Sequence, residues 1–111
     1  MNVREGSRDV ASPLWVLRRG LQRIYGQRLR GVYLFGSRAR GDADPDSDLD
    51  VLVVLDRVDH YLIELDRTGE FVSQISLASG VALSRVFIPE SEWLTGRSTF
   101  LENVREEAVP A

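Results

Sequence analysis

Two aspartates separated by one residue, Asp48 and Asp50, are the strongest candidates for chemistry in this chain of 111 residues. The β-branched, apolar stretch 49–55 predicts a strand. Residues i and i+2 of a strand share one face, with Cα atoms roughly 6.5–7 Å apart. Two carboxylates so placed repel each other and resist burial, and a bound divalent cation relieves both costs. Because hard oxygen ligands favour Mg²⁺, or Mn²⁺ in its place, we predict a metal site here.

A glycine-serine pair, Gly36-Ser37, follows the first predicted strand, residues 32–35. Glycine lets the main chain approach a ligand closely, and a turn there can aim successive N–H groups at an anion. The Ser37 hydroxyl is a further donor, and Gly41 lets the loop reverse towards the second strand. A phosphate cradle beside a metal-binding acid pair is the minimum apparatus for phosphoryl or nucleotidyl transfer.

Charge is unevenly distributed around these residues. The chain has seven arginines and no acid over 18–40, then five aspartates and no base over 42–50. This polarity suits a site that holds a polyphosphate and its metal ions. On charge alone, a solvated basic helix face beside an acidic loop is the simpler interpretation. Asp42, Asp44 and Asp46 are interpreted as turn-formers and not as ligands.

Two other phosphate- or metal-binding motifs do not fit the loop. A calcium loop starting at Asp42 requires glycine at its sixth position and glutamate at its twelfth, where this chain has Ser47 and Val53. A P-loop requires lysine, and the chain contains none. The absence of cysteine and the single histidine, His60, also exclude thiolate and multi-histidine metal sites.

Six elements are predicted to position these residues. Hydrophobic periodicity and glycine, proline and capping signals define their limits. They are a helix from the N-cap Ser12 to near Gly26, a strand over 32–35, a strand over 49–55, a helix from the cap Asp59 to Gly80, a strand over 81–88 and a short helix from Thr99 through Val104. The buried stripe of the second helix is predicted to contain Leu62, Leu65, Phe71, Val72, Ile75 and Leu77 or Ala78.

The order α-β-β-α-β-α predicts an α/β or α+β fold with a small mixed sheet and flanking helices. Length favours one domain, residues 1–111. No apolar run approaches the roughly 20 residues of a membrane span, and the N-terminus lacks a signal-peptide layout, so a cytoplasmic protein is expected. Trp15 and Trp93 are interpreted as core or interface residues and not as base-stacking platforms. Direct binding of nucleic acid is not expected.

Gly36-Ser37, Gly41 and the run 47–51 resemble the signature of the DNA polymerase beta-type nucleotidyltransferase superfamily. The whole segment 36–50 is very similar to its small stand-alone members, the minimal nucleotidyltransferases (MNT), and the likeness extends over nearly the whole chain. It implies the nucleotidyltransferase fold, with Asp48 and Asp50 as the catalytic, metal-binding aspartates. It implies that Gly36 and Ser37 hold the triphosphate of a nucleotide such as ATP. Arg38 or Arg40 either adds a phosphate contact or occupies a solvated loop position.

The chain departs from the superfamily pattern at one place. Larger members carry a third carboxylate on a later strand, whereas the strand 81–88 has Ser84 or Arg85 there, and Glu90 lies beyond its end. MNT proteins commonly pair with a HEPN-domain toxin, so the resemblance implies an antitoxin that transfers AMP to a toxin hydroxyl. The missing acid keeps an alternative open, a weak or inactive module that neutralises a HEPN toxin by binding. Transfer to a small molecule is the least favoured alternative.

Overall fold

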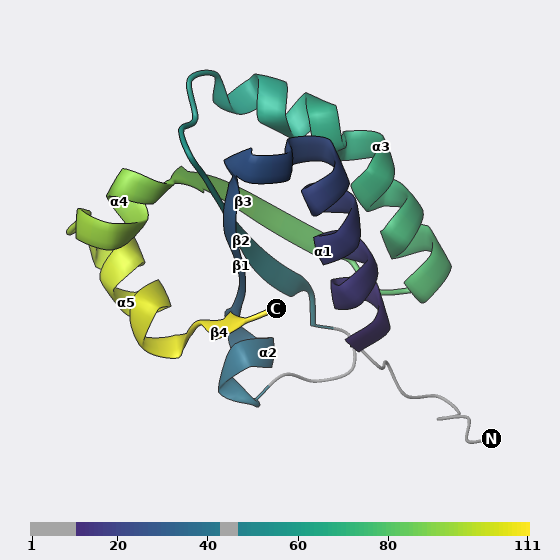
Figure 1. Ribbon diagram of the computed structural model, residues 1–111. Coiled ribbons are helices and arrows are strands. Elements are labelled where there is room, and N and C mark those ends of the chain that lie inside the picture. The colour runs from purple at the N-terminus through teal and green to yellow at the C-terminus, as the bar shows by residue number, and fades with distance from the viewer. Residues whose placement is uncertain (1–10, 43–46) are drawn as a thin grey trace.

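The computed structural model describes residues 11–42 and 47–111, which form a small sheet with helices around it (Figure 1). The predicted order of the six main elements is confirmed, and the short elements α2, α4 and β4 and a 3₁₀ turn are additional. In chain order the elements are α1 (Ala11–Tyr25), a 3₁₀ turn (Gly26–Arg28), β1 (Leu29–Phe35), α2 (Ser37–Arg40), β2 (Leu49–Leu55), α3 (Tyr61–Ser79), β3 (Leu83–Pro89), α4 (Glu90–Thr95), α5 (Thr99–Glu107) and β4 (Val109–Pro110).

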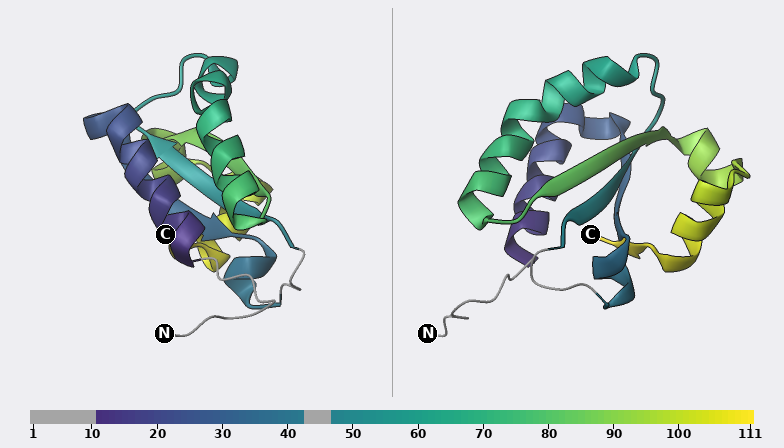
Figure 2. Two further views of the ribbon diagram at one scale, coloured as in Figure 1. Left: turned by 90° about the vertical axis from the view of Figure 1, so that its right-hand side faces the viewer. Right: turned by 180° about the vertical axis from the view of Figure 1, so that it is seen from behind.

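The described strands form one mixed sheet in the order β3-β2-β1-β4. β1 runs antiparallel to β2 and to β4, while β3 runs parallel to β2 and is reached through the crossover helix α3. Helices α1 and α3 cover one face of the sheet, and α4 and α5 lie against the other (Figure 2). The small mixed sheet with flanking helices is therefore as predicted.

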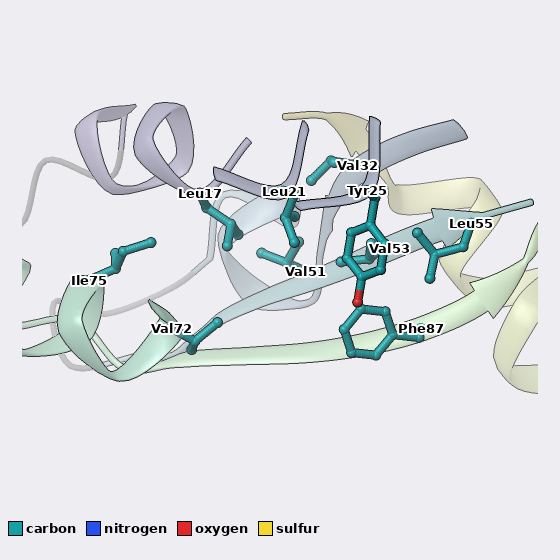
Figure 3. Close-up of a cluster of buried hydrophobic side chains, with 10 residues drawn as sticks. All are labelled: Leu17, Leu21, Tyr25, Val32, Val51, Val53, Leu55, Val72, Ile75 and Phe87. Carbon is teal, nitrogen blue, oxygen red and sulfur yellow. The ribbon is translucent and has the colours of Figure 1, made fainter. Parts of the chain in front are cut away.

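The central strand β2 divides the core into two layers because its side chains alternate between the faces. Val51, Val53 and Leu55 pack with Leu17 and Leu21 of α1 (Figure 3). Leu52 and Val54 pack with residues of α5 on the opposite face. Burial on both faces explains why the run 49–55 is apolar almost throughout. Asp50 shares the parity of Leu52 and Val54, which places it on the face that α5 partly covers.

The predicted buried stripe of α3 is wrong in part. Leu62 and Leu77 are 76% and 85% exposed, whereas the polar residues Glu64 and Thr68 are buried together with Val72 and Ile75. Glu64 tolerates burial because the Tyr25 hydroxyl donates to its Oε1 at 2.6 Å and Arg67 Nε donates to the same atom at 3.0 Å. The hydrogen bond from Tyr25 of α1 and the one from Arg67 within α3 thus make the burial of this polar residue possible.

Three predicted helix caps are shifted by one residue or more. The N-cap of α3 is His60 and not Asp59. The N-cap of α5 is Ser98 and not Thr99, because the Ser98 side chain accepts the N–H of Leu101 at 3.2 Å. Ser12 lies within α1, which already includes Ala11. The predicted C-terminal stop at Gly80 is confirmed, with left-handed backbone at φ 72°.

The two tryptophans lie in different environments. Trp93 is half-buried against Tyr33, with ring centroids 4.9 Å apart, whereas Trp15 is largely exposed beneath the Arg19 guanidinium. Trp15 is therefore not a core residue. None of the helices in the described residues is both long enough and apolar enough to cross a membrane.

Candidate active site

The candidate site lies where β1 ends and β2 begins. These strands are antiparallel neighbours, and Phe35, the last residue of β1, is the register partner of Asp50. Gly36 follows at once with φ 79° and ψ −159°, and a Cβ built on it would overlap Oδ2 of Asp50. The structure therefore brings the start of the predicted phosphate cradle against one of the two predicted metal ligands. A side chain at position 36 would fill the space that the Asp50 carboxylate occupies.

A single helical turn, α2, contains the rest of the predicted phosphate cradle. The Arg40 N–H donates to the Gly36 carbonyl at 3.1 Å, and the Asp42 N–H donates to the Ser37 carbonyl at 3.1 Å. Gly41 ends the turn in the left-handed conformation, with φ 81° and ψ 11°. Gly41 thus has the backbone conformation that ends the turn, and Ser37 is the first residue of the turn.

The two aspartates differ in burial. Asp48 is exposed and Asp50 is partly buried. Burial raises the pKa of the Asp50 carboxyl, and the negative charges of Asp48 and Glu107 raise it further. The positive charge of Arg40 lowers the pKa but does not cancel these effects. The site therefore carries more negative charge than its own side chains neutralise.

The donor set fits a hard divalent cation that keeps part of its water shell. Asp48 and Asp50 offer carboxylate oxygens, and the described residues contain no cluster of three or more histidine, cysteine, aspartate or glutamate side chains suited to a metal. Mg²⁺ is commonly held by one or two carboxylates plus water and substrate phosphates. Two aspartates beside the predicted phosphate cradle match this mode of Mg²⁺ coordination.

The two loop arginines make different contacts. Arg38 donates to the Ser47 carbonyl from Nε at 3.2 Å and from NH2 at 2.7 Å, which ties α2 to the segment that leads into Asp48. Arg40 pairs with Asp42 at 3.3 Å and with Glu107 at 3.3 Å. Arg40 therefore lies among the acids of the site, while Arg38 braces the loop. Asp44 and Asp46 fall outside the described residues.

The family model for the nucleotidyltransferase domain matches residues 16–105. The chain belongs to the nucleotidyltransferase domain family. It is 36% identical over 90 residues to a Methanocaldococcus jannaschii protein named "putative protein adenylyltransferase", covering 78% of this chain and 82% of that protein. The resemblance identified from the segment 36–50 is thus confirmed, and the protein is a nucleotidyltransferase enzyme.

Solved structures show the same fold. A crystal structure described as a toxin–antitoxin with AMP-PNP matches with a TM-score of 0.57 at 21% identity, covering 84% of this chain and 68% of the other. A crystal structure described as a "putative nucleotidyltransferase" from Sulfolobus solfataricus matches with a TM-score of 0.58 at 20% identity, covering 98% and 90%. At these identities the likeness establishes the nucleotidyltransferase fold.

The β3 strand of this nucleotidyltransferase carries no acid beside Asp50. Ser84 is the register partner of Asp50, and it is exposed. Arg85 has a structural role, because its Nε donates to Thr68 Oγ1 and its NH2 to the Leu65 carbonyl, each at 2.7 Å. Glu90 follows Pro89, the last residue of β3, which is the register partner of Leu55 at the end of β2 away from Asp50. The Glu90 carboxylate forms an ion pair with Arg30. Glu90 is therefore not a substitute for the third carboxylate.

Sequence reasoning missed Glu107, the last residue of α5. The Gly36 N–H donates to its Oε2 at 2.5 Å, although the two residues lie 71 positions apart. The capping signal predicted the start of this helix, but the helix was expected to end near Val104. Extending it by one turn would have placed Glu107 beyond Leu101 and Val104 on the side that faces the sheet.

Proposed function

We propose that this nucleotidyltransferase transfers AMP from ATP to a hydroxyl group of a partner protein, with Mg²⁺ or Mn²⁺ held by Asp48 and Asp50. The observation that carries the proposal is the contact of Gly36 with the Asp50 carboxylate, which puts a main-chain donor next to a candidate metal ligand. The name of the Methanocaldococcus relative supports protein adenylylation, and the AMP-PNP in the matching toxin–antitoxin structure supports an adenine nucleotide.

The residues of the site have distinct roles in this proposal. The Gly36 amide and the Ser37 hydroxyl hold phosphate oxygens, and Arg40 adds a guanidinium contact. Asp48 and Asp50 hold the metal, which when bound polarises the α-phosphate and neutralises the charge of the leaving pyrophosphate. Arg38 keeps the loop closed through Ser47 and stays a second candidate for a phosphate contact.

The transfer requires little covalent chemistry from the chain. The acceptor oxygen bonds to the α-phosphorus while the bond from that phosphorus to the bridging oxygen breaks, and pyrophosphate leaves. Since Ser84 stands beside Asp50, the acceptor proton passes to water, to a phosphate oxygen or to a group of the partner. Positioning and charge neutralisation, and not a dedicated base on β3, then account for the rate.

We further propose that the partner is a HEPN-domain toxin, that this chain is its antitoxin, and that residues 1–111 form a single minimal nucleotidyltransferase domain. The matching structure described as a toxin–antitoxin supports the pairing. The fold match, which covers 98% of the chain in the Sulfolobus structure, supports the single domain.

The test is to incubate the purified chain with ATP, Mg²⁺ and the product of the neighbouring gene, and to record the intact mass of both proteins. We expect the partner to gain the mass of AMP. Asp48→Asn combined with Asp50→Asn abolishes the gain, and Asp66→Asn, which changes an exposed acid of α3, preserves it. Absence of the gain with wild type, or an equal gain with the double variant, contradicts the proposal.

The second candidate function is neutralisation of the toxin by binding alone, and the position of Ser84 beside Asp50 favours it. Under that function the double asparagine variant still protects cells from the toxin. Loss of protection while the two proteins still bind each other rejects it. Transfer to a small molecule predicts a modified product in a substrate screen that contains no partner protein.

A further inference from the structure

The Glu107 carboxylate contacts the Gly36 amide and Arg40, the groups that the proposed function assigns to phosphate binding. Its Oε2 accepts the Gly36 N–H, and both of its oxygens lie within 3.4 Å of Arg40 NH1. A main-chain amide and a guanidinium thus converge on one anion contributed by a distant helix. A carboxylate resembles part of a phosphate group in its charge and in offering two acceptor oxygens.

The same carboxylate also lies close enough to Asp50 to act on it. It is one of the charges that raise the pKa of Asp50, so it adds a negative charge to an acid-rich site. Its side chain is 22% exposed, which leaves it only partly screened by solvent. The Gly36 N–H is a single donor and cannot make a good hydrogen bond to Glu107 and to a phosphate oxygen together. A triphosphate in the cradle therefore requires Glu107 to leave.

We propose that Glu107 is an internal substitute for a substrate phosphate, which holds the Gly36 amide and Arg40 in the phosphate-binding arrangement until the triphosphate displaces it. Rotation of the glutamate side chain between staggered rotamers suffices for the release, with no change in the sheet. Glu107 is then a positioning residue that lowers nucleotide affinity and keeps the cradle formed. The inference rests on the proposed function, because it assumes that a nucleoside triphosphate binds at Gly36.

The experiment compares Glu107→Gln with Glu106→Gln, which makes the same charge change at the exposed neighbouring position of α5. Calorimetry measures the dissociation constant of AMP-PNP, with and without Mg²⁺, and of sodium tripolyphosphate. Loss of one charge-assisted hydrogen bond that competes with the ligand predicts about tenfold tighter binding by Glu107→Gln, relative to wild type and to Glu106→Gln. If Glu107→Gln does not fold, Glu107→Asp, whose carboxylate is one methylene further from Gly36, replaces it with the same expected direction.

Amide NMR supplies a readout that does not depend on activity. The Gly36 N–H resonance of the nucleotide-free protein is expected to lie downfield because the hydrogen-bond acceptor is charged, and to move upfield in Glu107→Gln but not in Glu106→Gln. A merely structural tether of α5 predicts a lower melting temperature for Glu107→Gln with an unchanged dissociation constant.

The measurements distinguish failure of the displacement from failure of the proposed function. Equal affinities of Glu107→Gln and Glu106→Gln, or weaker binding by Glu107→Gln, overturn the displacement. AMP-PNP binding by wild type without AMP transfer to the partner refutes the proposed function, while the ratio of affinities still decides the role of Glu107. If wild type binds neither AMP-PNP nor tripolyphosphate, both proposals are refuted.

Discussion

Gly36→Ala tests whether the close approach of β1 to Asp50 is essential to the site. Position 36 has φ 79° and ψ −159°, a backbone region that is essentially restricted to glycine. The new methyl group would overlap Oδ2 of Asp50 and lie 3.2 Å from its Cγ and 3.3 Å from its Cβ. The substitution therefore imposes backbone strain and also displaces a candidate metal ligand.

Gly41→Ala is the matched control. Its φ of 81° also disfavours alanine, but a Cβ there meets no described atom within 4 Å. Left-handed strain alone is worth about 1–2 kcal/mol. Gly36→Ala incurs about 1–3 kcal/mol of strain and about 1–3 kcal/mol more for the steric overlap. We therefore expect Gly36→Ala to lose about 2–6 kcal/mol of unfolding free energy and Gly41→Ala about 1–2 kcal/mol.

The assays are urea unfolding and the rate of AMP transfer to the partner. Since a misplacement of about 1 Å can lower a rate about 100-fold, Gly36→Ala is expected to lose about that factor at a temperature where it is still folded. Gly41→Ala is expected to stay much closer to wild type. Equal stability and equal transfer rates of the two variants would refute the reasoning, because the Asp50 overlap distinguishes them.

Three further predictions concern charge and buried polar groups. Asp50→Asn removes a carboxylate whose pKa is raised by burial and by the charges of Asp48 and Glu107, so urea unfolding at pH 7 should show a higher free energy of unfolding than wild type while AMP transfer is lost. An unchanged or lower stability contradicts this. Tyr25→Phe removes the 2.6 Å hydrogen bond to buried Glu64 and should cost about 1.5–3 kcal/mol in the same assay; a cost below about 0.5 kcal/mol contradicts it. Burial raises the pKa of Glu64, but hydrogen bonds from Tyr25 and Arg67 and nearby positive charges outweigh it and hold the pKa below 4.5. The stabilisation by Glu64 is therefore complete above that pH and lost as the pH falls through the lowered value, so the cost of Tyr25→Phe should shrink in acid.

The sequence predicts well the strand that carries Asp50. The strand over 49–55 was predicted with the observed bounds, because an apolar, β-branched run buried on both faces has few other conformations available. Once β1 and β2 are antiparallel neighbours, the end of one meets the start of the other, and Gly36 must lie near Asp50. Local pattern predicted the two strands, and the antiparallel pairing that brings Gly36 to Asp50 comes from the structure.

The burial of α3 was not predictable in the same way. Apolar spacing favoured Leu62 and Leu77, yet the helix turns Glu64 and Thr68 inwards. Those two polar residues are stable inside because Tyr25 of α1 and Arg85 of β3 provide hydrogen bonds across the core. The decisive partners come from other elements, and no periodicity along residues 61–79 reports them.

The further acid near Asp50 comes from α5 and not from β3. The superfamily pattern places a third carboxylate on β3, while in this chain Glu107 of α5 contacts Gly36 and raises the pKa of Asp50. Leu101 and Val104 fix α5 against the sheet, and one turn later the same side of the helix presents Glu107. A charged residue at such a position is a local exception to hydrophobic patterning, and exceptions of that kind concentrate at functional sites. A hydrogen bond from the Gly36 amide and an ion pair with Arg40 stabilise the Glu107 carboxylate at this position. The same two groups would bind a phosphate in the proposed function.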